Sequence, residues 1–264
     1  MRSLLTVTGR DVCFVHWPVA PDAVRSLVPD ALELDTYDGS AWVSALALEV
    51  VSVGPGSVAP GPLSADPLAA LGRVAGGFPQ LVFRTYVRLD DEPGIYFLSV
   101  DTGSRAAATV GRRAFGLPFH GARMRRTRRE DGTVTFRSCR RKRGLDPSAS
   151  AATFQARYRP TGEPFEAESG SFEAFAIERF RYFLPPSTEQ VLGTGRGRVT
   201  SGAGEATRVG TVERVPWTLR SVDAEVRQNT LFEAVGLPAP TTAPTVRYSP
   251  GFEMAVGSGS ERDR

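Results

Sequence analysis

The chain has 264 residues, of which 41% are hydrophobic and 23% charged, and its net charge is +3. This ordinary globular balance supplies enough apolar residues for a large core. The longest near-apolar run, 41–53, is too short to span a bilayer, and the N-terminus lacks an apolar stretch of signal-peptide length. We therefore expect a soluble cytoplasmic protein with no membrane partner.

The two cysteines, Cys13 and Cys139, form no CxxC motif and have no histidine at metal-ligand spacing. In a cytoplasmic chain of this length we expect both to be free thiols. We also expect no metal and no other cofactor.

Short alternating segments, separated by turns rich in Gly, Pro and Asp, make up most of the chain. In chain order, the patterns predict strands at 12–16, 32–37, 41–53, 81–89, 95–101, 120–128, 134–142, 153–159 and 182–184. They predict helices at 21–29, 104–115, 171–179 and 229–235, the second capped by Ser104 or Thr102 and the third by Ser171. Asp38-Gly39 is expected to close one hairpin and EDGT (130–133) another, and 54–62 reads as a loop.

Many antiparallel strands with few helices predict an α+β fold that is mainly antiparallel β and closed or sandwich-like. We expect a single domain over 1–256, followed by a flexible polar tail over 257–264.

Alternation in 81–89 (LVFRTYVRL) places Arg84 and Tyr86 on one face of a strand. A buried arginine must be paired, so Arg84 is expected to hold a ligand carboxylate or enolate. The alternatives are an internal ion pair with Glu178 or another acid, and a stripe facing solvent. Tyr86 is a second candidate for ligand contact.

Seven segments together resemble the YqjF-like family, an uncharacterised group within the acetoacetate decarboxylase-like superfamily. They are VHWPV (15–19), LVPDALELDTYDGSAWVS (27–44), FRTYVR (83–88), GIYFLSVD (94–101), FGLPFHGARM (115–124), ERFRYF (178–183) and VPWTL (215–219). The resemblance covers nearly the whole chain. It implies one α+β unit built around a large antiparallel β-barrel or cone with a central cavity, and it implies no particular activity.

Acetoacetate decarboxylases carry a segment similar to GRxxFGxPKK, whose first lysine forms a Schiff base and whose second depresses the pKa of the first. In this chain GRRAFGLPFH (111–120) matches the glycines, the arginine, the phenylalanine and the proline, but Phe119 and His120 stand where the lysines would be. Phenylalanine forms no imine. The chain's one lysine, Lys142, lies in an arginine-dense segment, so Schiff-base chemistry is not expected.

The resemblance implies a cavity position for Phe119 and His120. A neutral imidazole there could act as a general acid or base, while the alternative for His120 is a polar core residue paired with backbone. Arg112, in the matched helix, is expected to form a structural salt bridge or to contact the ligand. Glu178 could form an acid/base pair with His120. For His16, beside Trp17 and Pro18, two interpretations stay open: its side chain packs in the interior, or it belongs to the site.

The segment 123–143 is strongly basic, with nine arginines and one lysine against Glu130 and Asp131. Arginines on both faces of a two-stranded ribbon could bind nucleic-acid phosphates. Only Phe136 is available for base stacking and no nucleic-acid-binding signature is present. A salt-bridged hairpin, placed at a subunit contact if the chain forms a homo-oligomer, is the preferred interpretation.

We therefore expect a protein that binds a small carboxylate, carbonyl or apolar ligand in a cavity enclosed by strands. The polar contacts would come from Arg84, Tyr86 and His120, with Phe119, Arg112 and Glu178 nearby. One alternative is a lyase or isomerase that works without lysine and uses His120 as acid and base. A third reading is nucleic-acid association through the hairpin at Arg123–Arg143.

Overall fold

The computed structural model describes residues 3–55, 77–141, 150–184 and 207–257. Several expected features fall outside these ranges: most of the loop at 54–62, Lys142, and the tail at 257–264 apart from Gly257. Most of the described chain is β-strand, with four short helices, as the sequence predicted.

Seven strands form a closed ring, because the last of them pairs back onto the first. Neighbouring strands are hydrogen-bonded in the order β1–β3–β4–β5–β10–β11–β13, and β13 pairs with β1. Their bounds are Ser3–Val19 (β1), Ala41–Pro55 (β3), Phe78–Leu89 (β4), Glu92–Thr102 (β5), Arg181–Leu184 (β10), Arg208–Glu213 (β11) and Thr245–Gly257 (β13). The expected cone-like closed sheet is confirmed, and its closure leaves the ring without an unpaired edge.

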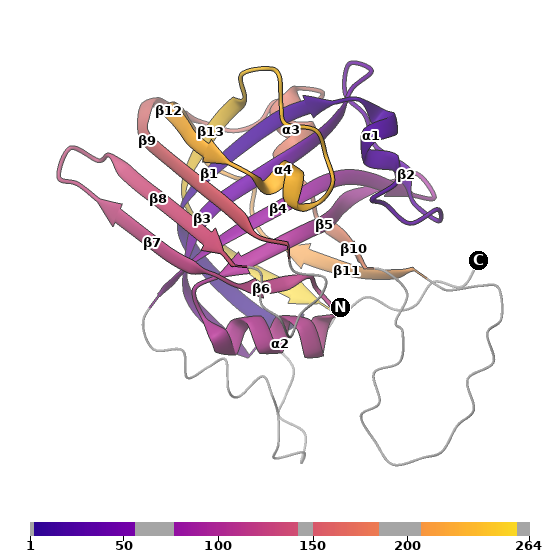
Figure 1. Ribbon diagram of the computed structural model, residues 1–264, viewed down its shortest axis with the longest axis horizontal. Coiled ribbons are helices and arrows are strands. Elements are labelled where there is room, and N and C mark those ends of the chain that lie inside the picture. Colours follow the sequence, from indigo (N-terminus) through magenta and orange to yellow (C-terminus); the bar gives the residue numbers. More distant parts are fainter. Residues whose placement is uncertain (1–2, 56–76, 142–149, 185–206, 258–264) are drawn as a thin grey trace, which may run out of the picture.

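A second sheet continues from β13 and covers one side of the ring (Figure 1). It consists of β12 (Leu219–Asn229), β9 (Ala152–Phe165), β8 (Val134–Arg140) and the edge strand β7 (Arg123–Arg128). Two short strands lie off this path: β2 (Glu33–Leu34) pairs with β4, and β6 (Phe119–Gly121) pairs with β5.

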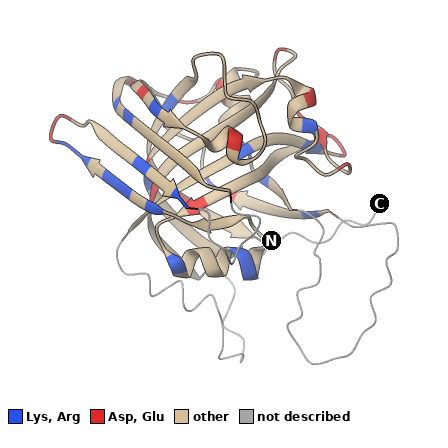
Figure 2. Cartoon of the chain, in the orientation of Figure 1, with Lys and Arg blue, Asp and Glu red and all other residues tan. Residues whose placement is uncertain are grey.

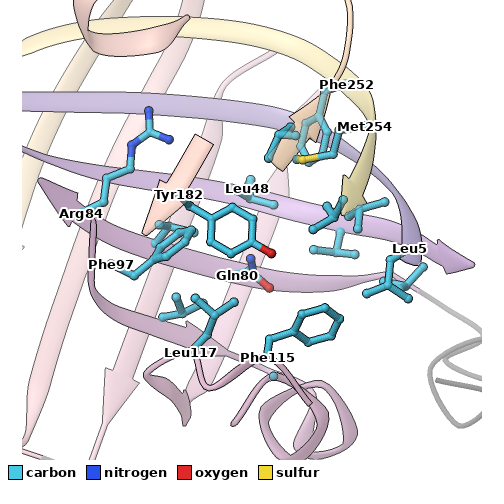
Figure 3. Close-up of a pocket in the computed structure, with 18 of the residues that line it drawn as sticks. Leu5, Leu48, Gln80, Arg84, Phe97, Phe115, Leu117, Tyr182, Phe252 and Met254 are labelled. Carbon is cyan, nitrogen blue, oxygen red and sulfur yellow. The ribbon is translucent and has the colours of Figure 1, made fainter. Parts of the chain in front are cut away.

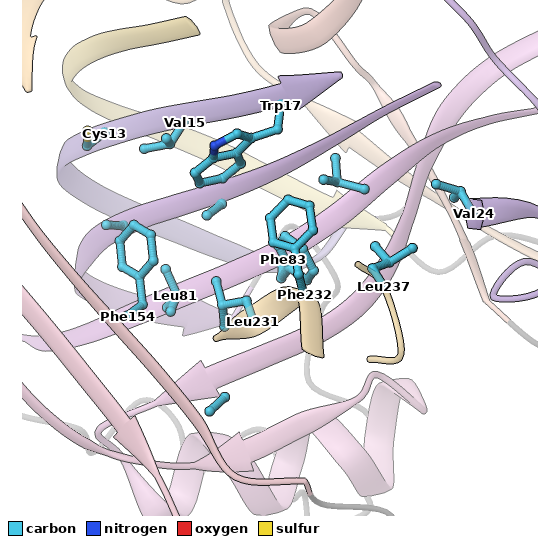
Figure 4. Packing of buried hydrophobic residues seen from close by; sticks show 14 of the residues in the cluster. Cys13, Val15, Trp17, Val24, Leu81, Phe83, Phe154, Leu231, Phe232 and Leu237 are labelled. Carbon is cyan, nitrogen blue, oxygen red and sulfur yellow. The ribbon is translucent and has the colours of Figure 1, made fainter. Parts of the chain in front are cut away.

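The two layers produce two apolar regions, one on each face of the ring strands. Between the ring and the second sheet, side chains of β1, β3 and β4 pack against those of β8 and β9 (Figure 4). Trp17 and Phe232 meet there edge to face, with ring centroids 5.4 Å apart. The inner face of the ring carries the second region, which includes Leu48, Val82 and Ile95. Alternation along β4 is as predicted, with Leu81 and Phe83 facing outward and Val82 and Arg84 inward.

The helices are α1 (Pro21–Arg25), α2 (Arg105–Phe115), α3 (Phe172–Ile177) and α4 (Leu231–Ala234). The predicted caps of two of them are confirmed, since Ser104 Oγ accepts from Ala107 N and Ser171 Oγ accepts from Ala174 N, each at 3.2 Å. Gly116, in the left-handed conformation with φ of 66°, ends α2. None of the helices in the described residues is long and apolar enough to cross a membrane.

Two predicted strand arrangements are wrong. The hairpin expected across Asp38-Gly39 reduces to a single bridge between Tyr37 and Ser40. The preceding segment pairs with β4 instead, because the Asp35 N–H donates to Tyr86 O at 3.1 Å. The strand expected at 120–128 is interrupted at Ala122, so that β6 runs parallel to β5 while β7 pairs with β8.

Candidate functional site

The ring contains a cavity of about 220 Å³ that is partly open to the outside (Figure 3). Its walls are mostly apolar and come from the ring strands, from α2 and the segment after it, from the end of α3, and from the segment that follows β11. The polar lining residues in the described chain are Gln80, Arg84, Arg179, Tyr182 and Arg214. A concave, mostly apolar space with a few polar groups is the usual form of a small-molecule site.

Three arginines of this lining converge on the C-terminal end of α3. Arg84 Nη2 donates to Ala176 O at 3.0 Å, and Arg214 Nη2 donates to Ile177 O at 3.0 Å. Arg179 Nε donates to Phe175 O. The last carbonyls of a helix lack partners within it and carry partial negative charge, so these guanidinium groups satisfy them. In this way α3 fixes one end of the cavity.

Two of these arginines also have carboxylate partners. Arg179 Nη1 lies 2.6 Å from Asp35 Oδ2, with the arginine side chain 4% exposed. Arg214 Nη1 lies 2.8 Å from Glu178 Oε2, with the arginine side chain 3% exposed. Both positive charges are therefore balanced inside the protein.

Arg84 is different, because no carboxylate of the described chain lies within salt-bridge distance of its guanidinium group. The residue is 7% exposed, and its buried Nε has no hydrogen-bond partner in the described part of the chain. Burial lowers the pKa of Arg84; the interaction with Tyr86 raises it in part, and the positive charge of Arg179 lowers it again. Arginine nevertheless stays protonated in proteins. This end of the cavity therefore carries one unbalanced positive charge.

Tyr86, two residues after Arg84 on β4, belongs to a buried polar cluster with His16 and Ser44. The Tyr86 hydroxyl donates to Ala176 O at 3.0 Å and is also hydrogen-bonded to Ser44 Oγ. His16 Nδ1 lies 2.6 Å from Ser44 Oγ, and its Nε2 has no partner in the described residues. These three side chains do not line the cavity. Tyr86 therefore supports α3, and the expected direct ligand contact stays a prediction.

His16 makes the stability of the protein sensitive to acid. Burial, and then the charges of Arg84 and Arg247, lower the pKa of His16 well below 6.5. The folded state therefore keeps His16 neutral at a pH where the unfolded chain takes up a proton. The contribution of neutral His16 to the free energy of unfolding is complete above about pH 6.5. Well below that pH, the contribution falls by roughly 1.4 kcal/mol for each pH unit. Urea denaturation between pH 7 and pH 5 should show a shallower pH slope for His16→Gln than for the wild type, and identical slopes would contradict this assignment.

The matched glycine-rich segment packs α2 against β6. Phe119 lines the cavity, and its ring lies so close to Gly111 that a Cβ there would be 2.3 Å from Phe119 Cδ2. Arg112 is exposed and donates from Nη1 to Phe119 O at 2.8 Å. Arg112 therefore holds the backbone of β6 and is not part of the cavity lining.

Gly111→Ala is expected to destabilise the protein by about 1–3 kcal/mol, because the gain of about 1 kcal/mol in helix propensity is smaller than the cost of displacing Phe119. Gly121→Ala is the matched control, since nothing lies within 4 Å of its added Cβ. Thermal denaturation of both variants checks this expectation. Equal melting temperatures would show that the contact between Gly111 and Phe119 is not restrictive.

His120 does not line the cavity. On β6 it follows Phe119, and side chains alternate along a strand. Phe119 is in register with Val100, and both line the cavity, whereas His120 is in register with the buried Asp101, which does not. The expected inward orientation of His120 is therefore wrong, and its catalytic role stays an untested prediction.

Glu178 pairs with Arg214 and accepts from the backbone N–H of Trp217 at 2.9 Å. It thus anchors the segment that carries Trp217, a cavity-lining residue. Glu178 therefore contacts Arg214. Arg84 contacts α3, the helix that ends just before Glu178, through Ala176 O. Glu178 itself does not line the cavity.

Ion pairs with buried carboxylates balance part of the positive charge of the basic hairpin, β7 and β8. Arg126 and Arg128 both pair with the buried Asp11, and Arg126 Nη1 also lies 2.7 Å from Glu49 Oε2. Arg140, 3% exposed, pairs with Asp101 at 3.3 Å. Other arginines remain exposed along β7, the edge strand of the second sheet (Figure 2). These ion pairs support the interpretation as a salt-bridged hairpin.

Cys13 and Cys139 are both free, as expected. Within the described ranges, no cluster of His, Cys, Asp and Glu could hold a metal ion.

The overall fold is shared with proteins of known structure. Acetoacetate decarboxylase from Legionella pneumophila matches with a TM-score of 0.62 and 14% identity, over 98% of this chain and 88% of that chain. The enduracididine biosynthesis enzyme MppR, in a complex with pyruvate, matches with a TM-score of 0.58 and 14% identity, over 100% of this chain and 91% of that chain. The chain therefore has the acetoacetate decarboxylase-like fold.

Residues 6–253 match the model of DUF2071, an uncharacterized conserved protein family, and the chain belongs to this family. It is 32% identical over 246 residues to the uncharacterized protein YqjF of Bacillus subtilis (strain 168), covering 93% of this chain and 87% of YqjF.

Proposed function

We propose that this protein binds a small carboxylic acid with an apolar body inside the ring, with Arg84 holding the carboxylate. The observation that carries the proposal is the buried guanidinium of Arg84, which has no carboxylate partner in the described residues and lies at one end of an apolar cavity. A buried charge without a counter-ion is costly, and an incoming carboxylate would balance it through charge-assisted hydrogen bonds.

The remaining lining supports an apolar body for this ligand. Side chains such as Leu48, Val82 and Phe97 would surround it and exclude water. One protein of the same fold, MppR, is described in a complex with pyruvate, which is itself a small carboxylate.

We propose binding without an imine intermediate. No lysine is among the described residues that line the cavity, and Phe119 contributes a ring to its wall where decarboxylases are expected to carry their Schiff-base lysine. No histidine of the described chain lines the cavity either, so nothing in the geometry favours the alternative of an acid/base enzyme that uses His120.

Calorimetric titration with octanoate and with octan-1-ol tests the proposal, since the two ligands share a tail of the same length and differ in charge. We expect octanoate to bind at least about ten-fold more tightly, in line with one buried charge-assisted hydrogen-bonding contact. Native mass spectrometry of the purified protein would show in addition whether an acid co-purifies. Equal affinity for both ligands, or binding of neither, would contradict the proposal.

A further inference from the structure

A second polar position lies along the cavity, away from the arginine end. Gln80 is four residues before Arg84 on β4 and points to the same side of the strand. At the rise of an extended strand, their Cα atoms are about 13 Å apart. Figure 3 shows the Gln80 amide projecting into the cavity, as the Tyr182 hydroxyl does.

The Gln80 amide has no hydrogen-bond partner within the described part of the chain, although it is half-buried among apolar walls. The Tyr182 hydroxyl donates to Gly257 O at 3.3 Å and keeps lone pairs free to accept. Burial raises the pKa of Tyr182 to about 12, so the hydroxyl stays neutral. The middle of the cavity thus offers uncharged donors and acceptors in otherwise apolar surroundings.

A purely apolar ligand would cover the Gln80 amide and leave it unpaired, which is unfavourable. A ligand with a polar atom at this depth would satisfy it. A ketone or hydroxyl suits the site, because a primary amide can both donate and accept. The charged residues of the described lining, Arg84, Arg179 and Arg214, gather at the α3 end of the cavity and not beside Gln80.

We propose that the ligand is a carboxylic acid that carries one uncharged oxygen, as a ketone or hydroxyl, part of the way along its apolar chain, and that Gln80 recognises this oxygen. This inference rests on the proposed function, since the carboxylate at Arg84 sets the ligand's position. Gln80 determines specificity along the chain, and Arg84 determines where the acid end lies.

Titration of octanoate and its mono-oxo isomers, with the ketone at each position of the chain, tests the proposal. We expect one isomer, or two adjacent ones, to bind roughly ten-fold more tightly than octanoate. In Gln80→Met this preference should disappear while octanoate binds as in the wild type or more tightly. Gln155→Met is the matched control, because Gln155 lies on β9 outside the cavity lining, and it should change neither affinity.

The possible results separate the two proposals. Octanoate binding with no preference for any oxo isomer, or a preference that survives in Gln80→Met, would overturn the role of Gln80 and leave the carboxylate site in place. No binding of any of these acids would overturn both proposals. Gln80→Met should fold normally, because the side chain that it removes makes no hydrogen bond in the described structure.

Discussion

Replacing Arg84 with methionine is expected to weaken carboxylate binding by about 100-fold, since removal of one partner of a buried, hydrogen-bonded charge pair costs 2–5 kcal/mol. Arg84→Lys should bind with intermediate affinity, because an ammonium group keeps the charge but lacks the planar fork that matches a carboxylate. The measurement is calorimetric titration of octanoate into each variant.

The same substitution is expected to leave the free energy of unfolding unchanged or to raise it. Arg84 has no carboxylate partner that its removal would strand in the described structure. Its hydrogen-bond acceptor, Ala176 O, also accepts from the Tyr86 hydroxyl at 3.0 Å and so remains satisfied. Replacing a buried charge with an apolar side chain of similar volume is often neutral or stabilising.

Arg88→Met is the matched control for binding. Arg88 is on the same strand, but its side chain is 37% exposed and lies outside the cavity lining. Its replacement should leave octanoate affinity within about two-fold, because surface substitutions away from a site have small effects. Equal losses of affinity in Arg84→Met and Arg88→Met would indicate a general charge effect and argue against a carboxylate site at Arg84.

Arg179→Met is expected to have the opposite effect on stability, lowering the free energy of unfolding by about 3 kcal/mol, since it removes the closer and more buried ion-pair partner of a buried carboxylate. The stranded group is Asp35, whose remaining ion-pair partner in the described chain is Arg88 at 3.4 Å. The substitution also removes the donor to Phe175 O at the end of α3. Urea denaturation monitored by circular dichroism measures the loss.

A double-mutant cycle identifies the cause of this loss. If the ion pair between Arg179 and Asp35 is responsible, Asp35→Leu combined with Arg179→Met should recover most of the stability lost in Arg179→Met alone. Additive losses would show that the two side chains contribute independently, which would contradict the pairing.

Local patterns were sufficient to predict much of the fold. The alternation of 81–89 correctly separated Arg84 from Leu81 and Phe83 on opposite faces of a strand, and Ser104 and Gly116 correctly marked the ends of α2. The closed, mainly antiparallel architecture followed from the number of short strands and from the family resemblance. Periodicity and capping act over a few residues, so the sequence reports them directly.

The residues that make up the candidate site could be predicted less well from the sequence. Arg179 and Arg214 reach the cavity because α3 ends there, and their contacts with Phe175 O and Ile177 O depend on how distant segments pack. Gln80 lay just before the predicted strand 81–89, and extending the same alternation by one residue would have placed it inward with Arg84. The orientation of His120 follows from the parallel pairing of β6 with β5, a contact between separate segments that local patterns do not report.

A crystal structure with bound 8-bromooctanoate tests the central claim most directly, because the anomalous signal of bromine locates the end of the ligand chain. We expect a carboxylate oxygen within about 3.2 Å of an Arg84 guanidinium nitrogen, which is hydrogen-bond distance. We expect the bromine among the apolar residues at the far end of the cavity, near Leu5 and Phe252. An acid bound only outside the ring, or bound inside it with its carboxylate away from Arg84, would contradict a carboxylate site at Arg84.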